Sequence, residues 1–162
     1  MKTLCVFFLI TLALLTVTAP ATHGQAKKQA QADIMAFLKD VYASDIPAAD
    51  VAKHHVGLTR SANDFSAEKR YGLAASHIQM LREGKSIKIG KPALDHVTVV
   101  PYNQLSKGQA LPFEVNAEQL QHVYAAIEDG AVIRCFIYQN GKVQSFDYLM
   151  KGKDGPHYFI AY

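Results

Sequence analysis

The chain has 162 residues, of which 49% are hydrophobic, 17 are Lys or Arg and 14 are Asp or Glu, so its formal net charge is +3. The basic residues are scattered along the chain rather than clustered, and this leaves nucleic-acid binding without support. Composition and charge therefore indicate a folded protein whose partners are not nucleic acids.

Residues 1–24 have the pattern of a secretory signal peptide. Lys2 supplies a short positive region, an apolar run extends from Leu4 to Val17, and small residues follow. The apolar run is shorter than the roughly 20 residues that span a bilayer. We therefore expect cleavage after Ala21 or Gly24. The mature protein is then exported and soluble, periplasmic or secreted, with no membrane span.

Residues 25–162 have the usual size of a single domain. They contain no internal repeat, low-complexity tract or linker. Cys5 would leave with the signal peptide, so Cys135 would have no intramolecular disulfide partner. The sequence thus predicts one domain that is not held by disulfides.

Three helices are predicted in the first half of this domain. Apolar residues recur at three- and four-residue spacings over 29–43 and over 66–83, which is typical of helices with one buried face. Pro47 suits the first turn of a shorter helix over 47–55. Gly84 can adopt the left-handed conformation that ends the third helix.

Beyond these helices the pattern changes to that of strands. The period becomes two at Ile87, and predicted strands cover 94–102, 131–139, 142–150 and 157–162. The pair Asn140-Gly141 favours a tight type I′ turn between the second and third of these strands. This hairpin is the clearest structural signal in the chain.

Residues 116–130 fit two structures. Asn116 and Gln119 form a capping pair, which predicts a helix. The alternative is a strand over 120–128. Asp129-Gly130, Asn140-Gly141 and Asp154-Gly155 would then be three successive turns of one antiparallel meander. Local propensity favours the helix and turn spacing the strand, with a slight preference for the strand.

The turn at Asn140-Gly141 fixes the expected pairing of the hairpin. Counting outward, Tyr138 faces Val143, Phe136 faces Ser145, and Arg134 faces Asp147. A cross-strand ion pair of this kind stabilises by roughly 0.2–1 kcal/mol. Alternatively, both charges lie on the concave face of a curved sheet. Asp147 would there be a poised acid or base, and Arg134 could receive a ligand carboxylate.

Aromatic residues crowd the predicted sheet. Tyr138, Phe136 and Tyr162 are the candidate ligand-binding residues, since a cavity can be apolar and still offer a few hydroxyl groups. Cys135 lies in mid-strand, where a thiol behaves as a small hydrophobic side chain. Histidine spacing matches no metal site, and no phosphate-binding or nucleophile motif is present, so neither metal nor cofactor is expected.

The order of a helix, a short helix, a long helix and a curved antiparallel sheet resembles the cystatin-like fold of the nuclear transport factor superfamily. The likeness is greatest to its small exported bacterial members. Residues 37–56, FLKDVYASDIPAADVAKHHV, resemble their opening helices, and residues 132–162 resemble their closing hairpins. The resemblance implies an α+β fold in which N-terminal helices pack on a cone-shaped C-terminal sheet.

The same resemblance implies where chemistry would occur. Enzymatic members, such as the ketosteroid isomerase and polyketide cyclase types, use an acid/base Asp or His inside the cone. Asp147, Arg134 and Tyr138 match such a site by placement, and none of them matches by motif.

Three functions are consistent with these observations. The first is an exported, non-catalytic binding protein that holds a small apolar or carboxylate ligand, or a partner peptide, on the concave face of the sheet. The second is a small cofactor-independent isomerase, cyclase or lyase in which Asp147 is the acid/base, oriented by Arg134. The third is a periplasmic inhibitor or immunity-type protein that acts through the loop 103–115. An open sheet edge could also support a homodimer.

Overall fold

The computed structural model describes residues 23–59, 65–85, 91–150, 152 and 155–162. Of the predicted signal peptide it describes only His23 and Gly24, which begin helix α1 (His23–Tyr42). The alternating residues from Ile87 and the first residue of the predicted turn at Asp154-Gly155 lie outside the described ranges. The signal peptide and the single-domain organisation stay predictions.

The three predicted helices are confirmed: α1 is followed by α2 (Ala48–His55) and α3 (Ala67–Arg82). Local residues set their ends. Pro47 immediately precedes α2, and the Ser66 hydroxyl accepts a hydrogen bond from the Lys69 main chain at the start of α3. Gly84 has φ +66°, the left-handed conformation expected where α3 ends.

Four strands form an antiparallel sheet in the order β1-β2-β3-β4: β1 (Val97–Pro101), β2 (Val123–Glu128), β3 (Ala131–Gln139) and β4 (Lys142–Ser145). Short 3₁₀ helices, Leu94–His96 and Tyr102–Gln104, flank β1, so this strand is shorter than predicted. Two-residue turns connect β2 to β3 at Asp129-Gly130 and β3 to β4 at Asn140-Gly141. All four residues have positive φ, with Asp129 at 47° and Asn140 at 55°. The Asn140-Gly141 hairpin is confirmed.

The expected single meander is wrong, because the strand predicted over 142–150 is broken. It divides into β4 and β5 (Tyr148–Met150), and β5 pairs with β6 (His157–Phe159) in a separate two-stranded sheet. Asp147 lies at the break. Its carboxylate accepts a hydrogen bond from the Tyr148 main chain at 3.0 Å, and its carbonyl accepts one from the Ser145 hydroxyl at 3.1 Å. Such local bonds compete with the ladder of a continuous strand.

The ambiguous segment 116–130 contains both predicted structures in succession. Asn116 and Gln119 form a capping box that starts the one-turn helix α4 (Ala117–Leu120). Strand β2 then begins at Val123. Each local signal was therefore valid over its own half of the segment.

Two β-bulges shift the register of the sheet. Tyr138 pairs with Val143 as predicted, but the next pair is Ile137 with Ser145, so Gln144 is an extra residue in β4. Between β2 and β3, Ala126 pairs with Arg134 and Ile127 pairs with Val132, so Ile133 is an extra residue in β3. The predicted direct pairings of Phe136 with Ser145 and of Arg134 with Asp147 are wrong for this reason.

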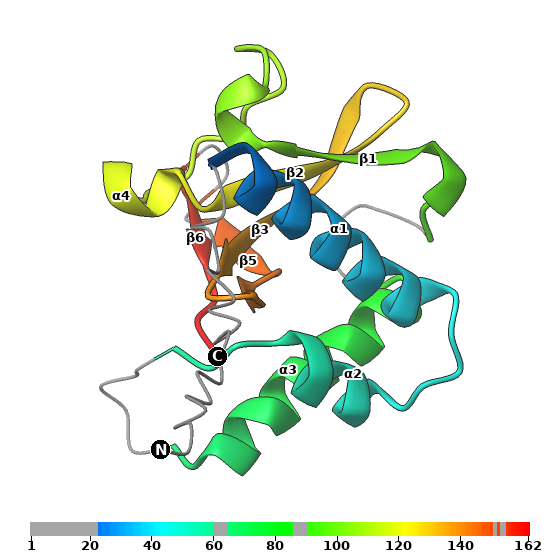
Figure 1. The fold of residues 1–162 in the computed structure, drawn as a ribbon. Helices are drawn as coiled ribbons and strands as arrows, with labels where there is room; N and C mark the ends of the chain where they lie inside the picture. The colour runs from blue at the N-terminus through cyan, green and yellow to red at the C-terminus, as the bar shows by residue number, and fades with distance from the viewer. Residues whose placement is uncertain (1–22, 60–64, 86–90, 151, 153–154) are drawn as a thin grey trace, which may run out of the picture.

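The bulge at Gln144 decides which side chains enter the core. Strict alternation would put Val143 and Phe146 on opposite faces of the strand. With one extra residue between them, both join the core cluster between the sheet and the helices. In Figure 1, α1 lies between β1 and the pair formed by α2 and α3, so these helices cover one face of the sheet.

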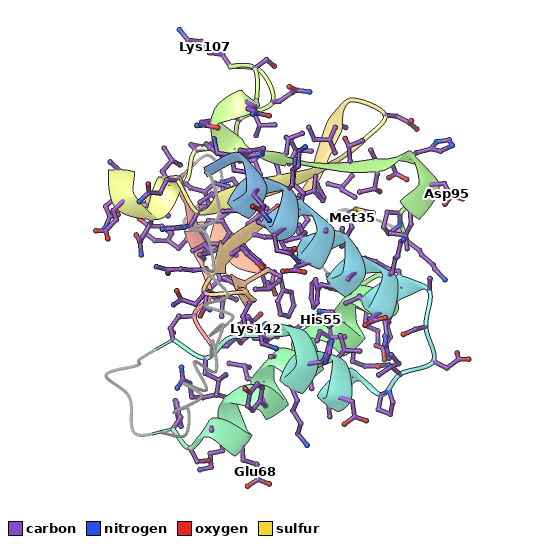
Figure 2. The ribbon with its side chains drawn as sticks, in the orientation of Figure 1. Met35, His55, Glu68, Asp95, Lys107 and Lys142 are labelled. Atoms are coloured by element: carbon purple, nitrogen blue, oxygen red, sulfur yellow. The ribbon has the colours of Figure 1, made fainter. Side chains whose placement is uncertain are left out.

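The opposite face of the sheet carries a second, smaller core. Cys135 and its buried neighbours there are covered by Phe159 of β6 and by the segment 105–113. The predicted surface loop 103–115 thus packs against the sheet through part of its length, and Lys107 projects at its outer end (Figure 2). The α+β class, with helices packed on an antiparallel sheet, is confirmed.

Candidate functional site

The two predicted catalytic residues meet, although they are not paired across the hairpin. Asp147 lies just beyond β4, and one of its carboxylate oxygens is 3.6 Å from the Arg134 guanidinium. Arg134 is 5% exposed and also donates a hydrogen bond to the Phe146 carbonyl at 3.1 Å. The guanidinium is therefore engaged by neighbouring groups inside the fold.

Two further residues complete this cluster. The His77 Nδ1 of α3 lies 3.4 Å from the second carboxylate oxygen of Asp147 and 2.7 Å from the Tyr162 hydroxyl. We call Arg134, Asp147, His77 and Tyr162 the interior cluster. His77 belongs to α3, immediately before the buried Ile78, so helical spacing could have placed it near the core. Its contact with Asp147 is long-range and leaves no local pattern in the sequence.

The interior cluster is mostly removed from water. The Tyr162 residue is 1% exposed, whereas the side chains of His77 and Asp147 are 16% and 18% exposed. Burial raises the pKa of the Tyr162 phenol, and the negative charge of Asp147 adds to this effect, while Arg134 opposes it. Burial likewise raises the pKa of Tyr42, with Arg134 again acting in the opposite direction. Both phenols are therefore neutral at physiological pH.

Aromatic rings fill the space around this cluster. The Tyr162 ring stacks on Phe146 at a centroid distance of 5.0 Å, and Phe37 of α1 meets Phe136 at 6.2 Å. The Phe136 residue is 0% exposed. Two of the predicted ligand-binding residues, Phe136 and Tyr162, are thus core side chains that contact protein groups.

Tyr138, the third predicted ligand-binding residue, has a different position. It is 8% exposed, and its hydroxyl bonds the Asp33 carboxylate of α1. Burial and this carboxylate both raise the pKa of the Tyr138 phenol. Tyr138 also lines the end recess described below.

Two recesses lie beside the segment 119–122 and the end of β3. The end recess has a volume of about 550 Å³. It is lined by residues of the range 25–30 in α1, by Gln121 and His122, by Tyr124 and Tyr138, and by the turn residues 139–141.

The side recess has a volume of about 220 Å³. It is lined by Thr59, Glu114, Val115, Gln119, His122, Ile137, Gln139, Gln144, Ser145 and residues 158–161. His122 and Gln139 line both recesses, so the two hollows are neighbours around the end of β3. Tyr138 lines the end recess on the helix-covered face of the sheet, and Ile137 lines the side recess on the opposite face. Of the three ligand-binding residues predicted from the sequence, only Tyr138 lines a recess, because exposed amides on separate elements form no motif.

Other chemistry-bearing residues are arranged as parts of the fold. Burial raises the pKa of the Cys135 thiol to about 12, despite an opposing effect of Arg134. The thiol is accordingly protonated and not activated as a nucleophile. In the described ranges, no three His, Cys, Asp or Glu side chains gather where they could hold a metal ion.

Comparisons with protein-family models, curated proteins and solved structures find no match for this chain. No helix in the part of the chain that the structure describes has both the length and the apolar character needed to cross a bilayer. The interior cluster and the two recesses are therefore the candidate sites of this protein.

Proposed function

We propose that the chain is an exported binding protein that holds its ligand in the end recess. The observation that carries this proposal is the hollow of about 550 Å³ between the start of α1 and the ends of the sheet strands. Ligand sites usually have volumes of roughly 300–1,000 Å³ and combine aromatic walls with a few polar groups. The signal-peptide pattern of residues 1–24 supports export.

The lining of the end recess combines aromatic side chains with polar groups at its rim. Tyr124 and Tyr138 are 6% and 8% exposed and form a floor whose rings meet edge to face at 6.2 Å. The Tyr138 hydroxyl is held by Asp33, which fixes that ring. Side chains held by packing and by hydrogen bonds need little reordering when a ligand binds.

The rim of the recess offers polar groups that the fold does not use. The side-chain amides of Gln121 and Gln139 are exposed and make no hydrogen bond to any other described residue. The interior cluster differs in this respect, since its polar atoms bond one another and a main-chain carbonyl. Available donors and acceptors thus favour the recess as the place where a ligand binds.

A blocking variant tests the proposal. Gln139→Trp would place a large ring beside both recesses, and Gln104→Trp is the control because Gln104 is also exposed and lines neither recess. We expect amide resonances of the recess residues to shift when ¹⁵N-labelled protein is titrated with a library of small polar, carboxylate and aromatic compounds. Gln139→Trp should abolish these shifts and Gln104→Trp should keep them. Shifts confined to other surfaces, or unchanged in Gln139→Trp, would contradict the proposal.

A second candidate is an acid/base enzyme of the isomerase, cyclase or lyase type, favoured by the contacts of Asp147. Its carboxylate lies between the Arg134 guanidinium at 3.6 Å and the His77 imidazole at 3.4 Å. A carboxylate flanked in this way could exchange a proton with a carbon acid. The test is deuterium exchange at the α-carbon of ketone and β-keto ester probes. Wild type should exceed both buffer and Asp147→Asn, and equal rates in all three would remove the enzymatic candidate.

A further inference from the structure

We infer that the two recesses together form one groove that binds an uncharged oligosaccharide. This inference rests on the proposed binding function and specifies the class of ligand. We call the end recess and the side recess together the amide groove.

The groove is longer than a pocket for one small molecule. Its two parts share His122 and Gln139, and they extend from the start of α1 to the residues that follow β6. The two volumes are about 550 Å³ and 220 Å³. An extended ligand made of repeated units fits such a shape better than a compact one.

Glutamine side chains are concentrated in this groove. Of the ten glutamines in the chain, six line it, so primary amides are its principal polar groups. They are Gln25, Gln29, Gln119, Gln121, Gln139 and Gln144. Amides both donate and accept hydrogen bonds without carrying charge, which complements sugar hydroxyls, themselves donors and acceptors.

Hydrogen bonds within the protein use only part of this capacity. Gln144 donates through Nε2 to the Gln139 carbonyl at 3.0 Å, which leaves its Oε1 available. Gln29 donates through Nε2 to Asp33 at 2.8 Å, and Gln119 accepts through Oε1 from the Asn116 main chain. The groove therefore retains both kinds of group, and some of its amides are held in position.

Aromatic rings supply the other requirement of a sugar site. Tyr158 and Phe159 are partly exposed and line the side recess, although one face of the Phe159 ring is already stacked on Phe113 at 4.3 Å. The C–H face of a sugar ring is apolar and packs on an aromatic surface, while the hydroxyls at its edge reach polar neighbours. The Tyr158 hydroxyl bonds Glu114, which fixes the direction of its ring.

The charges of the groove do not favour an ionic ligand. Lys27 lies in the end recess and Glu114 in the side recess, and no other Lys, Arg, Asp or Glu lines either hollow as the structure describes them. A ligand with the same charge along its length would be attracted at one end and repelled at the other. A neutral polymer meets no such conflict.

An extended peptide would be the main competing ligand, and the sheet edges near the groove are already occupied. Gly57 donates to the Val143 carbonyl at 2.9 Å, so the segment after α2 covers the edge of β4. Along β6, His157 donates to the Pro112 carbonyl at 2.7 Å and accepts from Glu114 at 2.9 Å. A peptide that binds by adding a strand needs a free edge, which these contacts remove.

Calorimetric titration of the wild-type chain tests the inference, with maltohexaose, cellohexaose and chitohexaose as probes and an uncharged hexapeptide as the competitor. We expect at least one hexaose to bind saturably and roughly tenfold more tightly than its disaccharide, because only the longer ligand contacts both recesses. Gln121→Ala and Gln139→Ala should each weaken this binding several-fold. Gln104→Ala is the matched control and should have no effect.

The outcomes separate this inference from the proposed function. If the peptide or small compounds shift groove resonances while none of the hexaoses binds, the inference is overturned and the binding function stands. Hexaose binding that is insensitive to both groove substitutions would also overturn the inference. If no probe of any class shifts groove resonances, both proposals fail.

Discussion

The interior cluster and the amide groove differ in how their polar groups are used. Arg134, Asp147, His77 and Tyr162 bond one another and a main-chain carbonyl, and aromatic rings surround them. The groove is hollow, and amides such as Gln121 keep their donors and acceptors free of other described residues. The residue types of the interior cluster suggest a catalytic site, whereas the open volume and the available amides of the amide groove favour it as the place where a ligand binds.

Substitutions in the two regions should therefore have different consequences. Changes in the interior should reduce stability, because its groups are mutually satisfied and packed. Changes on the groove rim should alter binding and leave stability nearly unchanged.

Phe136→Ala should have the largest effect. Phe136 is fully buried and contacts the Phe37 ring, so its removal leaves a cavity between the sheet and α1. We expect a loss of about 3–5 kcal/mol in the free energy of unfolding, measured by urea denaturation. Phe65→Ala is the control, since Phe65 is 61% exposed, and it should change stability by less than about 0.5 kcal/mol. Similar losses for both variants would mean that the interior is not packed as described.

Arg134→Met should lower the free energy of unfolding by about 3 kcal/mol, because it removes one partner of a mostly buried ion pair. Asp147→Asn removes the other charge, and the double variant completes a thermodynamic cycle. We expect a coupling energy of about 0.5–3 kcal/mol from urea denaturation of the wild type and the three variants. Strict additivity would show that the two charges do not interact and that the interior cluster is not a unit.

Alkaline pH should destabilise the protein partly through Cys135. The unfolded thiol loses its proton above an ordinary pKa of 9.0, whereas burial holds the folded pKa near 12. The unfolded state therefore binds fewer protons between these values, and stability falls as pH rises. Raised phenol pKa values, as at Tyr42, act in the same direction.

Cys135→Ala isolates the contribution of the thiol. Between pH 9 and 11 the free energy of unfolding of this variant should fall less steeply than that of wild type. The two slopes should differ by about 1.4 kcal/mol per pH unit. Chemical denaturation at several pH values measures both slopes. Identical slopes would mean that the thiol titrates normally and is not buried.

Gly57→Ala should have a smaller effect that connects stability with the groove. A Cβ at Gly57 would lie 2.2 Å from the Gln144 amide nitrogen and 2.9 Å from the Lys142 Cβ. We expect a loss of about 1–2 kcal/mol from this overpacking, together with displacement of the Gln144 side chain from the side recess. Adding Gln144→Ala should recover part of the loss in thermal denaturation. No recovery would place the conflict at Lys142 instead.

Sequence patterns were sufficient wherever a local rule decides the structure. The apolar spacing of 66–83 predicted α3, Asn140-Gly141 predicted a turn with positive φ, and the Asn116–Gln119 pair predicted the helix start now seen at α4. These features depend on neighbouring residues along the chain, which is the information that a sequence displays directly.

The remaining features depend on contacts between distant segments. Counting along the hairpin correctly joined Tyr138 with Val143, but it could not include the extra residue at Gln144. The contact of His77 with Asp147 links α3 to a break between strands, and no periodicity marks it. The groove was missed because its amides come from four separate parts of the chain and share no spacing.

The bulge at Gln144 has a consequence for how the chain can vary in length. Deleting this one residue would leave Val143 opposite Tyr138 and Ser145 opposite Ile137, as they already are. A deletion elsewhere in the strand would turn every later side chain to the wrong face. Related chains should therefore tolerate the loss of a residue at position 144 while keeping the same interior, although they would lose one amide of the groove.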